Sequence, residues 1–496
     1  MGRVTSGVAL GVALGICLAS GSLAMAADCA ALSKSGVFGP NVAVRGAKTV
    51  AADAASGALA FCEVTSTISP VPGSKIGAVY RLPENWNGRM LGIGGGGWAG
   101  NVTLAAALPG LQRGYATAQT DGGHESPNGG DPSWVKGNAV AVTDFSHRAV
   151  HEMTVLGKKV VTERYGKKAD RDYFQGCSTG GRMALMEAQR YPDDYHGIIA
   201  GAPVYTLLTQ TSPVIRHQIF AGAGASLTEA QLKRVNAAVV EACDANDGLK
   251  DGVITDPRRC NWNPSQLQCK AGQTADCLNA AQVKALQQAY ETRRTSGGLV
   301  GNYGMTRGSE AGWGRFVAAD QATELNAMNG GLGDLIPLIF PNGSYDATRF
   351  DPEKQQAAVH RTPFAREYEA SSTDLKPFFT KGGKLIVWHG QDDPGPSPYA
   401  TTDWVEKARK ANGTQDFEYF VLPGVYHCRG GPGADEFDSL TAIESWVEKG
   451  QRPTRLVAGK ANSPMKRPLC PWPQLPYYSG KGDANDAASF QCRAAP

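Results

Sequence analysis

The sequence predicts an α/β protein in which a single parallel sheet is interrupted by an inserted domain. Short apolar segments alternate with helical patterns in the first half of the chain, and the same alternation returns near residue 384. This alternation is typical of parallel sheets, because parallel strands need a crossover connection. Residues 204–371 lack the rhythm and hold four cysteines among Gly-, Asn- and Pro-rich loops. We therefore expect an α/β domain made of residues 27–203 and 372–496, with residues 204–371 inserted as a lid.

The individual elements are predicted from the period of their apolar residues. Short apolar runs bounded by glycine or polar residues predict strands at 76–81, 89–93, 115–119, 172–175, 197–200, 384–388 and 417–422. Helical spacing predicts helices at 144–165, 181–191, 399–412 and 436–449 in the α/β domain, and at 229–240 and 280–293 in the insertion. The Pro-rich tail after Lys466 is expected to lie along the surface.

Residues 1–26 have the features of a secretory signal. Arg3 gives a positive start, residues 8–23 are apolar and small, and Ala24-Met25-Ala26 is an A-x-A cleavage site. No later apolar run is long enough to span a bilayer. We therefore expect cleavage before Ala27 and a mature protein that is secreted or periplasmic, without a membrane partner.

The cysteine count and the charge narrow the class of protein further. Eleven cysteines are present, and ten remain once Cys17 leaves with the signal; an even number in an exported chain predicts disulfides. They do not form paired C-x-x-C motifs, which argues against a structural zinc site. The formal charge is +3, or +2 without Arg3, and charges of both signs are interspersed. This balance argues against a nucleic-acid partner.

A candidate nucleophile lies between a predicted strand and a predicted helix. Gly176-Cys177-Ser178-Thr179-Gly180 fits the pattern G-x-S-x-G, which occurs once in the chain. Small residues on either side of the serine allow the sharp turn that exposes a nucleophile. A plain tight turn is the alternative, and the strand–turn–helix context favours the nucleophile, Ser178.

Two further candidates follow later strands. Asp393 comes directly after the strand at 384–388, and His427 comes after the strand at 417–422. A serine needs a base to take its proton, and the base needs a carboxylate to fix its tautomer. The order Ser, Asp, His is that of α/β-hydrolases, so we expect Ser178, Asp393 and His427 as a catalytic triad in an α/β-hydrolase fold. Asp392 is the rival carboxylate, and His389 is expected to support the loop.

An oxyanion hole requires two hydrogen-bond donors near the nucleophile. The N–H of Thr179, the residue after the serine, is the usual first donor. The glycine cluster 94–97 follows an early strand, and we expect Gly97 to supply the second. Residues 92–97 also fit the dinucleotide pattern G-x-G-x-x-G, but no helix obviously follows them, and an exported protein seldom meets NAD.

Cysteines flank both the nucleophile and the base. Cys177 precedes Ser178, and Cys428 follows His427. If Ser178 and His427 touch, these neighbours are close enough to bond. Such a disulfide would close a loop of about 250 residues, which the chain-entropy model values at about 5 kcal/mol.

The arrangement Cys177-Ser178, Asp393 and His427-Cys428 resembles the CS-D-HC motif of the tannase and feruloyl esterase family. The resemblance extends over nearly the whole mature chain and includes residues 120–124 and 176–182. It implies an α/β-hydrolase domain with a lid that binds calcium and the aromatic acyl group, a small aromatic ester substrate, and no organic cofactor. It also implies the disulfides Cys29–Cys62, Cys177–Cys428, Cys243–Cys260, Cys269–Cys277 and Cys470–Cys492.

A candidate calcium loop lies in the insertion, at residues 244–253. Three carboxylates within eight residues, those of Asp244, Asp247 and Asp251, repel one another unless a cation neutralises them. The carbonyl oxygens of Leu249 and Val253 are the expected further ligands, and the loop is similar to the calcium loop of the family at these positions. A solvated acidic turn is the alternative.

The sequence predicts the acid part of the expected ester substrate less sharply. Aromatic lid residues are candidates to hold an aromatic ring, although a place in the lid core is the simpler interpretation for each: Trp313, Phe316, Phe340, Tyr345 and Phe350. Arg315 and Arg349 are candidates for a substrate carboxylate. We expect feruloyl esterase- or tannase-like activity, with mono(hydroxyethyl) terephthalate hydrolysis as the alternative. An inactive hydrolase fold that serves as a binding protein is the alternative from another class.

Overall fold

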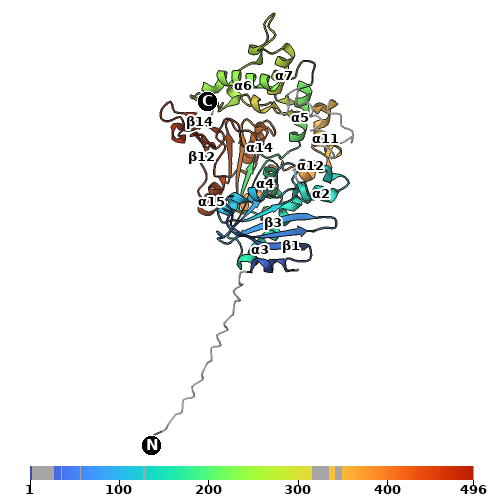
Figure 1. The fold of residues 1–496 in the computed structure, drawn as a ribbon, viewed down its shortest axis with the longest axis vertical. Coiled ribbons are helices and arrows are strands. Elements are labelled where there is room, and N and C mark those ends of the chain that lie inside the picture. Colours follow the sequence, from blue (N-terminus) through green and yellow to red (C-terminus); the bar gives the residue numbers. More distant parts are fainter. Residues whose placement is uncertain are drawn as a thin grey trace.

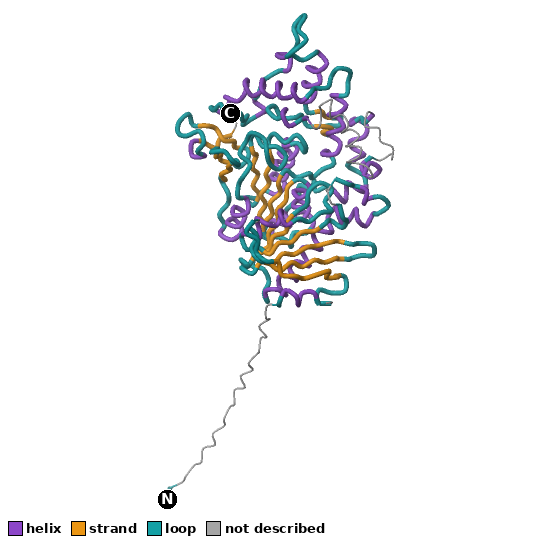
Figure 2. The backbone as a smooth tube through the Cα atoms, viewed as in Figure 1, coloured by secondary structure: helices purple, strands orange, loops and turns teal. Residues whose placement is uncertain are grey.

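A nine-stranded sheet forms the centre of the computed structural model, which describes residues 1–2, 27–34, 36–55, 57–126, 130–314, 335–340 and 349–494 (Figures 1 and 2). Along the sheet the order is β1-β2-β3-β5-β4-β6-β7-β10-β11. The strands from β5 to β11 in this order run parallel, and β1, β2 and β3 are added antiparallel at one side. Their bounds are Val42–Val50 (β1), Phe61–Ile68 (β2), Ile76–Pro83 (β3), Arg89–Ile93 (β4), Ala116–Thr120 (β5), Arg171–Cys177 (β6), Gly197–Gly201 (β7), Lys384–Gly390 (β10) and Phe417–Leu422 (β11).

Helices cover both faces of this sheet, which is the layering of an α/β-hydrolase fold. In β10, Leu385 and Val387 join one hydrophobic core, while Ile386 and Trp388 join the other, because successive strand residues point to opposite faces. The first core is shared with α3 (Ala149–Tyr165), α4 (Thr179–Arg190) and α14 (Pro398–Asn412), and the second with α1 (Leu104–Gln112) and α15 (Ser439–Lys449).

Several element boundaries differ from those expected. The helix expected at 144–165 begins as α2 (Ala139–Thr143), passes through a π-helical turn (Asp144–Arg148) and continues as α3. The helix expected at 436–449 begins only at Ser439, because the Asp438 side chain caps it by accepting the Thr441 N–H. The expectation that no helix follows the glycine cluster was wrong, since α1 follows it; Pro109 inside α1 obscures the helical pattern.

The inserted lid leaves the sheet after β7 and returns to it at β10, although these two strands are neighbours. Its two ends lie side by side, where Ala370 N–H donates to Tyr205 O (2.9 Å) and Glu369 Oε1 accepts Leu207 N–H (2.8 Å). In Figure 1, α5, α6 and α7 lie together at the top, far from β1. Where the structure describes the chain between β7 and β10, its α-helices and strands are α5 (Leu208–Phe220), α6 (Glu229–Cys243), α7 (Ala280–Tyr290), β8 (Arg293–Arg294), β9 (Val300–Asn302), α10 (Ile336–Ile339), α11 (Pro352–Val359), α12 (Pro363–Tyr368) and α13 (Lys376–Thr380).

The C-terminal segment is more ordered than the surface tail that we expected. It forms two small antiparallel sheets from β12 (Leu456–Gly459), β13 (Lys466–Leu469), β14 (Gln474–Tyr478) and β15 (Phe490–Ala494). Leu475 and Phe490 are buried, and Trp472 N–H donates to Tyr419 O of β11 (2.8 Å). The segment therefore contributes to the core.

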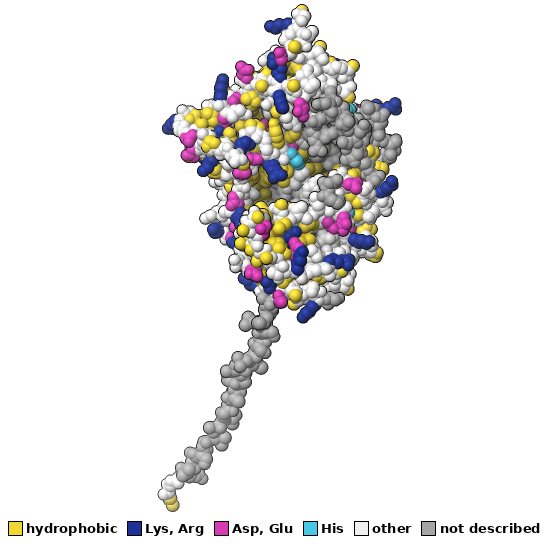
Figure 3. Space-filling model, in the orientation of Figure 1, with side chains coloured by type: hydrophobic (Ala, Val, Ile, Leu, Met, Phe, Trp, Pro, Cys, Tyr) yellow, Lys and Arg dark blue, Asp and Glu magenta, His cyan; other side chains and the backbone are white. Residues whose placement is uncertain are grey.

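Two further observations concern the surface and the N-terminus. Lys and Arg side chains are mixed with Asp and Glu over the visible face in Figure 3, in keeping with the small formal charge of +3.

Of the helices that the structure describes, none has the length and apolar character needed to cross a membrane. The expected signal falls almost entirely on residues 3–26, which lie outside the described residues.

Candidate active site

Ser178 occupies a strained turn between β6 and α4. Its φ of 65° lies in the left-handed region that residues other than glycine rarely adopt. The backbone is held on both sides, because Ser178 N–H donates to Gly201 O (3.0 Å) and Ser178 O accepts Val204 N–H (3.1 Å). A Cβ atom on Gly176 would lie 2.5 Å from the Gly180 backbone, so the flanking glycines of the motif are needed for this close approach.

The three residues expected as a triad form one hydrogen-bonded chain. Ser178 Oγ lies 2.9 Å from His427 Nε2, and His427 Nδ1 lies 2.6 Å from Asp393 Oδ2. With the proton on Nδ1, His427 donates to the carboxylate and accepts from the serine hydroxyl. The Asp393 side chain is fully buried, whereas that of His427 is 35% exposed. The base therefore faces the side from which a substrate can enter.

Asp393 is a buried carboxylate whose oxygens all have donors. His427 and His389 both donate to Oδ2, the latter from Nε2 at 3.1 Å, and Gly395 N–H donates to Oδ1 at 2.8 Å. Burial by itself raises the pKa of Asp393, and the hydrogen bonds from the two histidines outweigh it, so that the pKa is lowered. The second nitrogen of His389 contacts Thr401 Oγ1 (2.9 Å), which fixes the ring. His389, which we expected to support the loop, thus binds the carboxylate of the acid itself.

Asp392, the rival carboxylate, lies in a different environment. The structure brings His427 to Asp393 and turns the side chain of Asp392 into the interior, where it is 1% exposed. Burial, with a smaller contribution from the negative charge of Glu310, raises the pKa of Asp392 well above its usual value. Only Asp393 contacts the base, and its pKa is lowered whereas that of Asp392 is raised, so the geometry and the electrostatics both favour Asp393.

Thr179 and Gly97 lie together beside the nucleophile. The Thr179 hydroxyl donates to Gly97 O (2.5 Å), which joins the glycine cluster to the first residue of α4. The first N–H groups of a helix have no partner within the helix, and the helix dipole makes this end positive. The Thr179 N–H is therefore suited to bind an oxyanion, and the structure places Gly97 next to it.

Cys177 and Cys428 are bonded, with Cα atoms 6.0 Å apart and a sequence separation of 251 residues. The bond joins the residue before the nucleophile to the residue after the base, so it ties the two loops of the site together. The structure also forms the other four disulfides that the family resemblance implied: Cys29–Cys62, Cys243–Cys260, Cys269–Cys277 and Cys470–Cys492.

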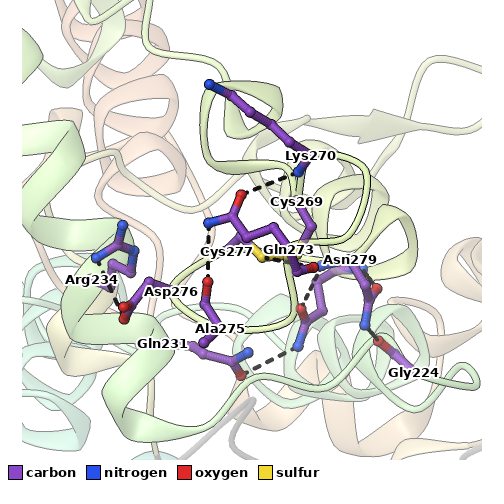
Figure 4. The surroundings of a disulfide bond; sticks show 11 residues. Gly224, Gln231, Arg234, Cys269, Lys270, Gln273, Ala275, Asp276, Cys277 and Asn279 are labelled. Carbon is purple, nitrogen blue, oxygen red and sulfur yellow. Dashed lines mark hydrogen bonds and ion pairs between the residues drawn. A yellow bond between two sulfur atoms is a disulfide. The ribbon is translucent and has the colours of Figure 1, made fainter.

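The Cys269–Cys277 bond closes a short lid loop beside α6 (Figure 4). Inside this loop, Lys270 N–H donates to the Gln273 side chain (3.2 Å), which in turn donates to Ala275 O (3.0 Å). Outside it, Asp276 lies 4.0 Å from Arg234 of α6. This disulfide therefore stabilises the lid and is separate in sequence from the triad.

The candidate calcium loop gathers carboxylates at the edge of the lid. Asp244 and Asp247 are 7% and 5% exposed. Asp244 accepts the Gly252 N–H (2.9 Å), and Asp247 accepts the Thr255 hydroxyl (2.6 Å). Burial, with smaller contributions from the negative charges of Asp251 and Asp244, raises the pKa of Asp247 to about 6.

The donor chemistry of this loop suits a hard cation, but its arrangement is not that of a formed metal site. Within the described part of the chain, no group of three or more His, Cys, Asp or Glu side chains is placed to hold a metal ion. Asp251 is paired with Arg467 of β13. A cavity of about 10 Å³, which has room for one water-sized sphere, lies beside Asp247, Asp251 and Val253.

The aromatic lid candidates that the structure describes, Trp313, Phe340 and Phe350, are buried in the lid core. Trp313 is fully buried and donates from Nε1 to Ser309 Oγ (2.7 Å). Phe340 and Phe350 are also buried, and their rings contact each other edge to face with centroids 5.5 Å apart. Of the other candidates, Arg349 is exposed, and the structure does not describe Arg315, Phe316 and Tyr345.

Next to the triad lies a charged residue that the sequence did not predict as part of the site. Arg216 of α5 is 1% exposed, and its guanidinium donates to the carbonyl oxygens of Pro394 and Gly395, directly after Asp393. In the sequence it is an arginine among apolar residues of a lid helix, and that pattern carries no signal for such a contact.

Comparisons with known proteins identify the family of this chain. The family model described as "Tannase and feruloyl esterase" matches residues 62–493. The chain is 32% identical to mono(2-hydroxyethyl) terephthalate hydrolase of Piscinibacter sakaiensis, over 88% of this chain and 85% of that protein. It is 30% identical to a probable feruloyl esterase of Arthroderma benhamiae, over 83% and 81%. The crystal structure of feruloyl esterase B from Aspergillus oryzae superposes with a TM-score of 0.79 at 26% identity, over 91% and 97%.

We expect Ser178→Ala to remove ester hydrolysis, lowering kcat by at least about 10⁴-fold while the fold remains intact. His427→Ala should be comparably severe, because triad residues act as a unit. Asp393→Asn should cost much more activity than Asp392→Asn, since only Asp393 contacts the base. Steady-state kinetics on a p-nitrophenyl ester, with circular dichroism to verify folding, measure these effects.

The matched control for this series is labelling with a serine-reactive phosphonate. The wild-type protein should be labelled at Ser178, and the alanine variant should not be labelled. Full hydrolytic activity in Ser178→Ala, with a contaminating esterase excluded, would contradict the triad.

Replacing Cys177 and Cys428 together by serine should lower both the melting temperature and kcat. The bond restricts the unfolded chain, by about 5 kcal/mol in the chain-entropy model, and also holds the nucleophile and base loops in register. Peptide mapping without reduction should recover the two segments as one species. The double variant Cys269→Ser/Cys277→Ser is the control, and it should lower stability with little change in kcat. A free thiol at either position in protein from an oxidising compartment would show that this bond is absent.

Proposed function

The chain belongs to the tannase and feruloyl esterase family, and we propose that it is an exported serine esterase that cleaves esters of small aromatic acids through an acyl-enzyme. It is a carboxylic ester hydrolase by its family and relatives. The observation that carries the mechanism is the hydrogen-bonded chain from Ser178 through His427 to Asp393. Five disulfides support export, because such bonds persist in oxidising compartments.

Acylation follows from this geometry. As Ser178 Oγ attacks the ester carbonyl carbon, His427 Nε2 takes the hydroxyl proton, and the negative charge moves to the carbonyl oxygen. The Thr179 N–H and the glycine cluster at Gly97 stabilise this oxyanion. When the tetrahedral intermediate collapses, His427 returns the proton to the alcohol oxygen, the alcohol leaves, and the acid stays bound to the serine.

Deacylation repeats these steps with water. His427 takes a proton from the water as its oxygen attacks the acyl carbon, and then returns the proton to Ser178 Oγ as the acid leaves. Each time His427 becomes positively charged, the buried carboxylate of Asp393 stabilises it. The lowered pKa of Asp393, which its hydrogen bonds produce against the effect of burial, keeps that carboxylate ionised throughout the cycle.

The names of the relatives support an aromatic acid as the acyl group. A probable feruloyl esterase and a mono(2-hydroxyethyl) terephthalate hydrolase are 30% and 32% identical to this chain over most of their length. The acids in those names are small and contain an aromatic ring. A terephthalate monoester is the second candidate substrate, favoured by the 32% identity to the terephthalate hydrolase.

We also propose a structural calcium ion in the lid, held by the carboxylates of Asp244, Asp247 and Asp251 and the carbonyl oxygens of Leu249 and Val253. The support is the burial of two of these carboxylates and their mutual effect on the pKa of Asp247. Binding would require Asp251 to turn from Arg467. The ion would neutralise the loop, and no step of ester hydrolysis passes through it.

The substrate proposal predicts that methyl ferulate or methyl gallate is hydrolysed with a higher kcat/KM than long-chain acyl esters. The reason is that an aromatic ring is bound as a rigid unit, whereas a long acyl chain must be ordered. A panel of methyl hydroxycinnamates, methyl gallate, mono(2-hydroxyethyl) terephthalate and p-nitrophenyl palmitate measures this. A kcat/KM on the palmitate that exceeds those on every aromatic ester would point to a lipase.

The calcium proposal predicts that exhaustive chelation lowers the melting temperature and that added calcium restores it, because a ligand bound only to the native state stabilises it. Asp247→Asn should make the melting temperature independent of chelation and of added calcium. Asp276→Asn, which changes a largely exposed aspartate in a neighbouring lid loop, is the control and should retain the dependence. A melting temperature indifferent to chelation and to added calcium, with no metal by elemental analysis, would leave an acidic turn neutralised by Arg467.

A further inference from the structure

Arg216 lies where the lid contacts the loop of the catalytic acid. It belongs to α5, the first helix of the lid, and is 1% exposed. Its Nη1 donates to Pro394 O (2.5 Å) and to Gly395 O (3.2 Å). These oxygens belong to the two residues that follow Asp393, so a charged side chain of the lid binds the backbone of the acid loop.

A single peptide group connects Arg216 to the catalytic carboxylate. The carbonyl of Pro394 and the N–H of Gly395 belong to the same planar peptide unit. Arg216 binds this unit at its oxygen, and Asp393 Oδ1 binds it at its N–H (2.8 Å). A rotation of the peptide that broke one hydrogen bond would also disturb the other. The orientation of the carboxylate therefore depends on the position of the guanidinium.

The charges around Asp393 support the same connection. Burial lowers the pKa of Arg216, and the negative charge of Asp393 partly offsets this effect; the resulting pKa of about 10 leaves the guanidinium charged at neutral pH. The titratable groups that face Asp393 are His427, His389 of β10 and Arg216 of α5. The lid thus supplies a positive charge to a carboxylate in the loop that follows β10.

We propose that Arg216 is a positioning residue, which orients Asp393 through the Pro394–Gly395 peptide and so makes the triad depend on the docking of the lid. The inference rests on the proposed esterase function. It predicts that a substitution of Arg216 lowers the rate of the chemical step, even for an ester that is too small to contact the lid.

The test uses Arg216→Lys and Arg216→Met in the full-length protein, with p-nitrophenyl acetate as substrate. Lysine keeps the charge and loses the planar fork, whereas methionine loses both. We expect kcat to fall by on the order of 10²-fold in Arg216→Met and by less in Arg216→Lys, because small misplacements of catalytic groups have effects of this size. KM should change little, since the Arg216 side chain is buried and binds backbone carbonyl oxygens.

The pH profile of kcat/KM separates positioning from a purely structural role. If Arg216→Lys displaces the Asp393 carboxylate, the His427 imidazolium loses the partner that stabilises it. The acid limb of the kcat/KM profile of this variant then moves to lower pH. Arg182→Lys is the matched control, because Arg182 is a buried arginine that binds backbone oxygens of Phe145 and Tyr368. It should lower the melting temperature and leave the acid limb unchanged.

A double-mutant cycle tests whether Arg216 acts through Asp393. In the Asp393→Asn background, Arg216→Lys should cost little further activity, because the group that it orients is already lost. Additive losses in kcat, or an unchanged acid limb with only a lower melting temperature, would overturn the proposal and leave Arg216 as a structural residue. Activity that persists in Ser178→Ala would instead refute the esterase mechanism itself, so the two failures are distinguishable.

Discussion

The arrangement of the site depends on the burial of one carboxylate. Removing the charge of Asp393 from water is costly unless donors surround it, and this chain supplies them from β10, from the loop after β11 and from the backbone of Gly395. Each donor must itself be held in place. Thr401 fixes the His389 ring, and Arg216 binds the loop that contains Gly395. The need to satisfy one buried charge thus organises three separate parts of the chain.

The sheet explains why these parts meet. β6, β7, β10 and β11 are parallel neighbours, so their carboxyl ends reach the same edge of the sheet. The nucleophile follows β6, the acid follows β10 and the base follows β11, and the lid begins directly after β7. The Cys177–Cys428 bond then joins the first and the last of these loops. Rigid strands set the positions, and the loops carry the chemistry.

The sequence predicted the features that have a local signal. The buried strands β4 and β11 were predicted with their observed bounds, because they are short, apolar runs between glycine or polar residues. The preference for Asp393 over Asp392 agrees with the hydrogen bond to His427. The half-exposed strand β1 and the proline-containing helix α1 lack a clean period and were missed. The contact of Arg216 with Pro394 spans 178 residues, and no local pattern can encode it.

The way in which the lid joins the sheet has a consequence for how such proteins evolve. Because Tyr205 and Ala370 are paired and Glu369 binds Leu207, the insertion enters and leaves through one narrow junction. An insertion with adjacent ends can be lengthened, shortened or exchanged without altering the register of the strands on either side. Selection can therefore diversify substrate choice by replacing the lid as a module. A lid without an arginine equivalent to Arg216 would leave two carbonyl oxygens beside the catalytic acid without their donor, so not every exchange is neutral.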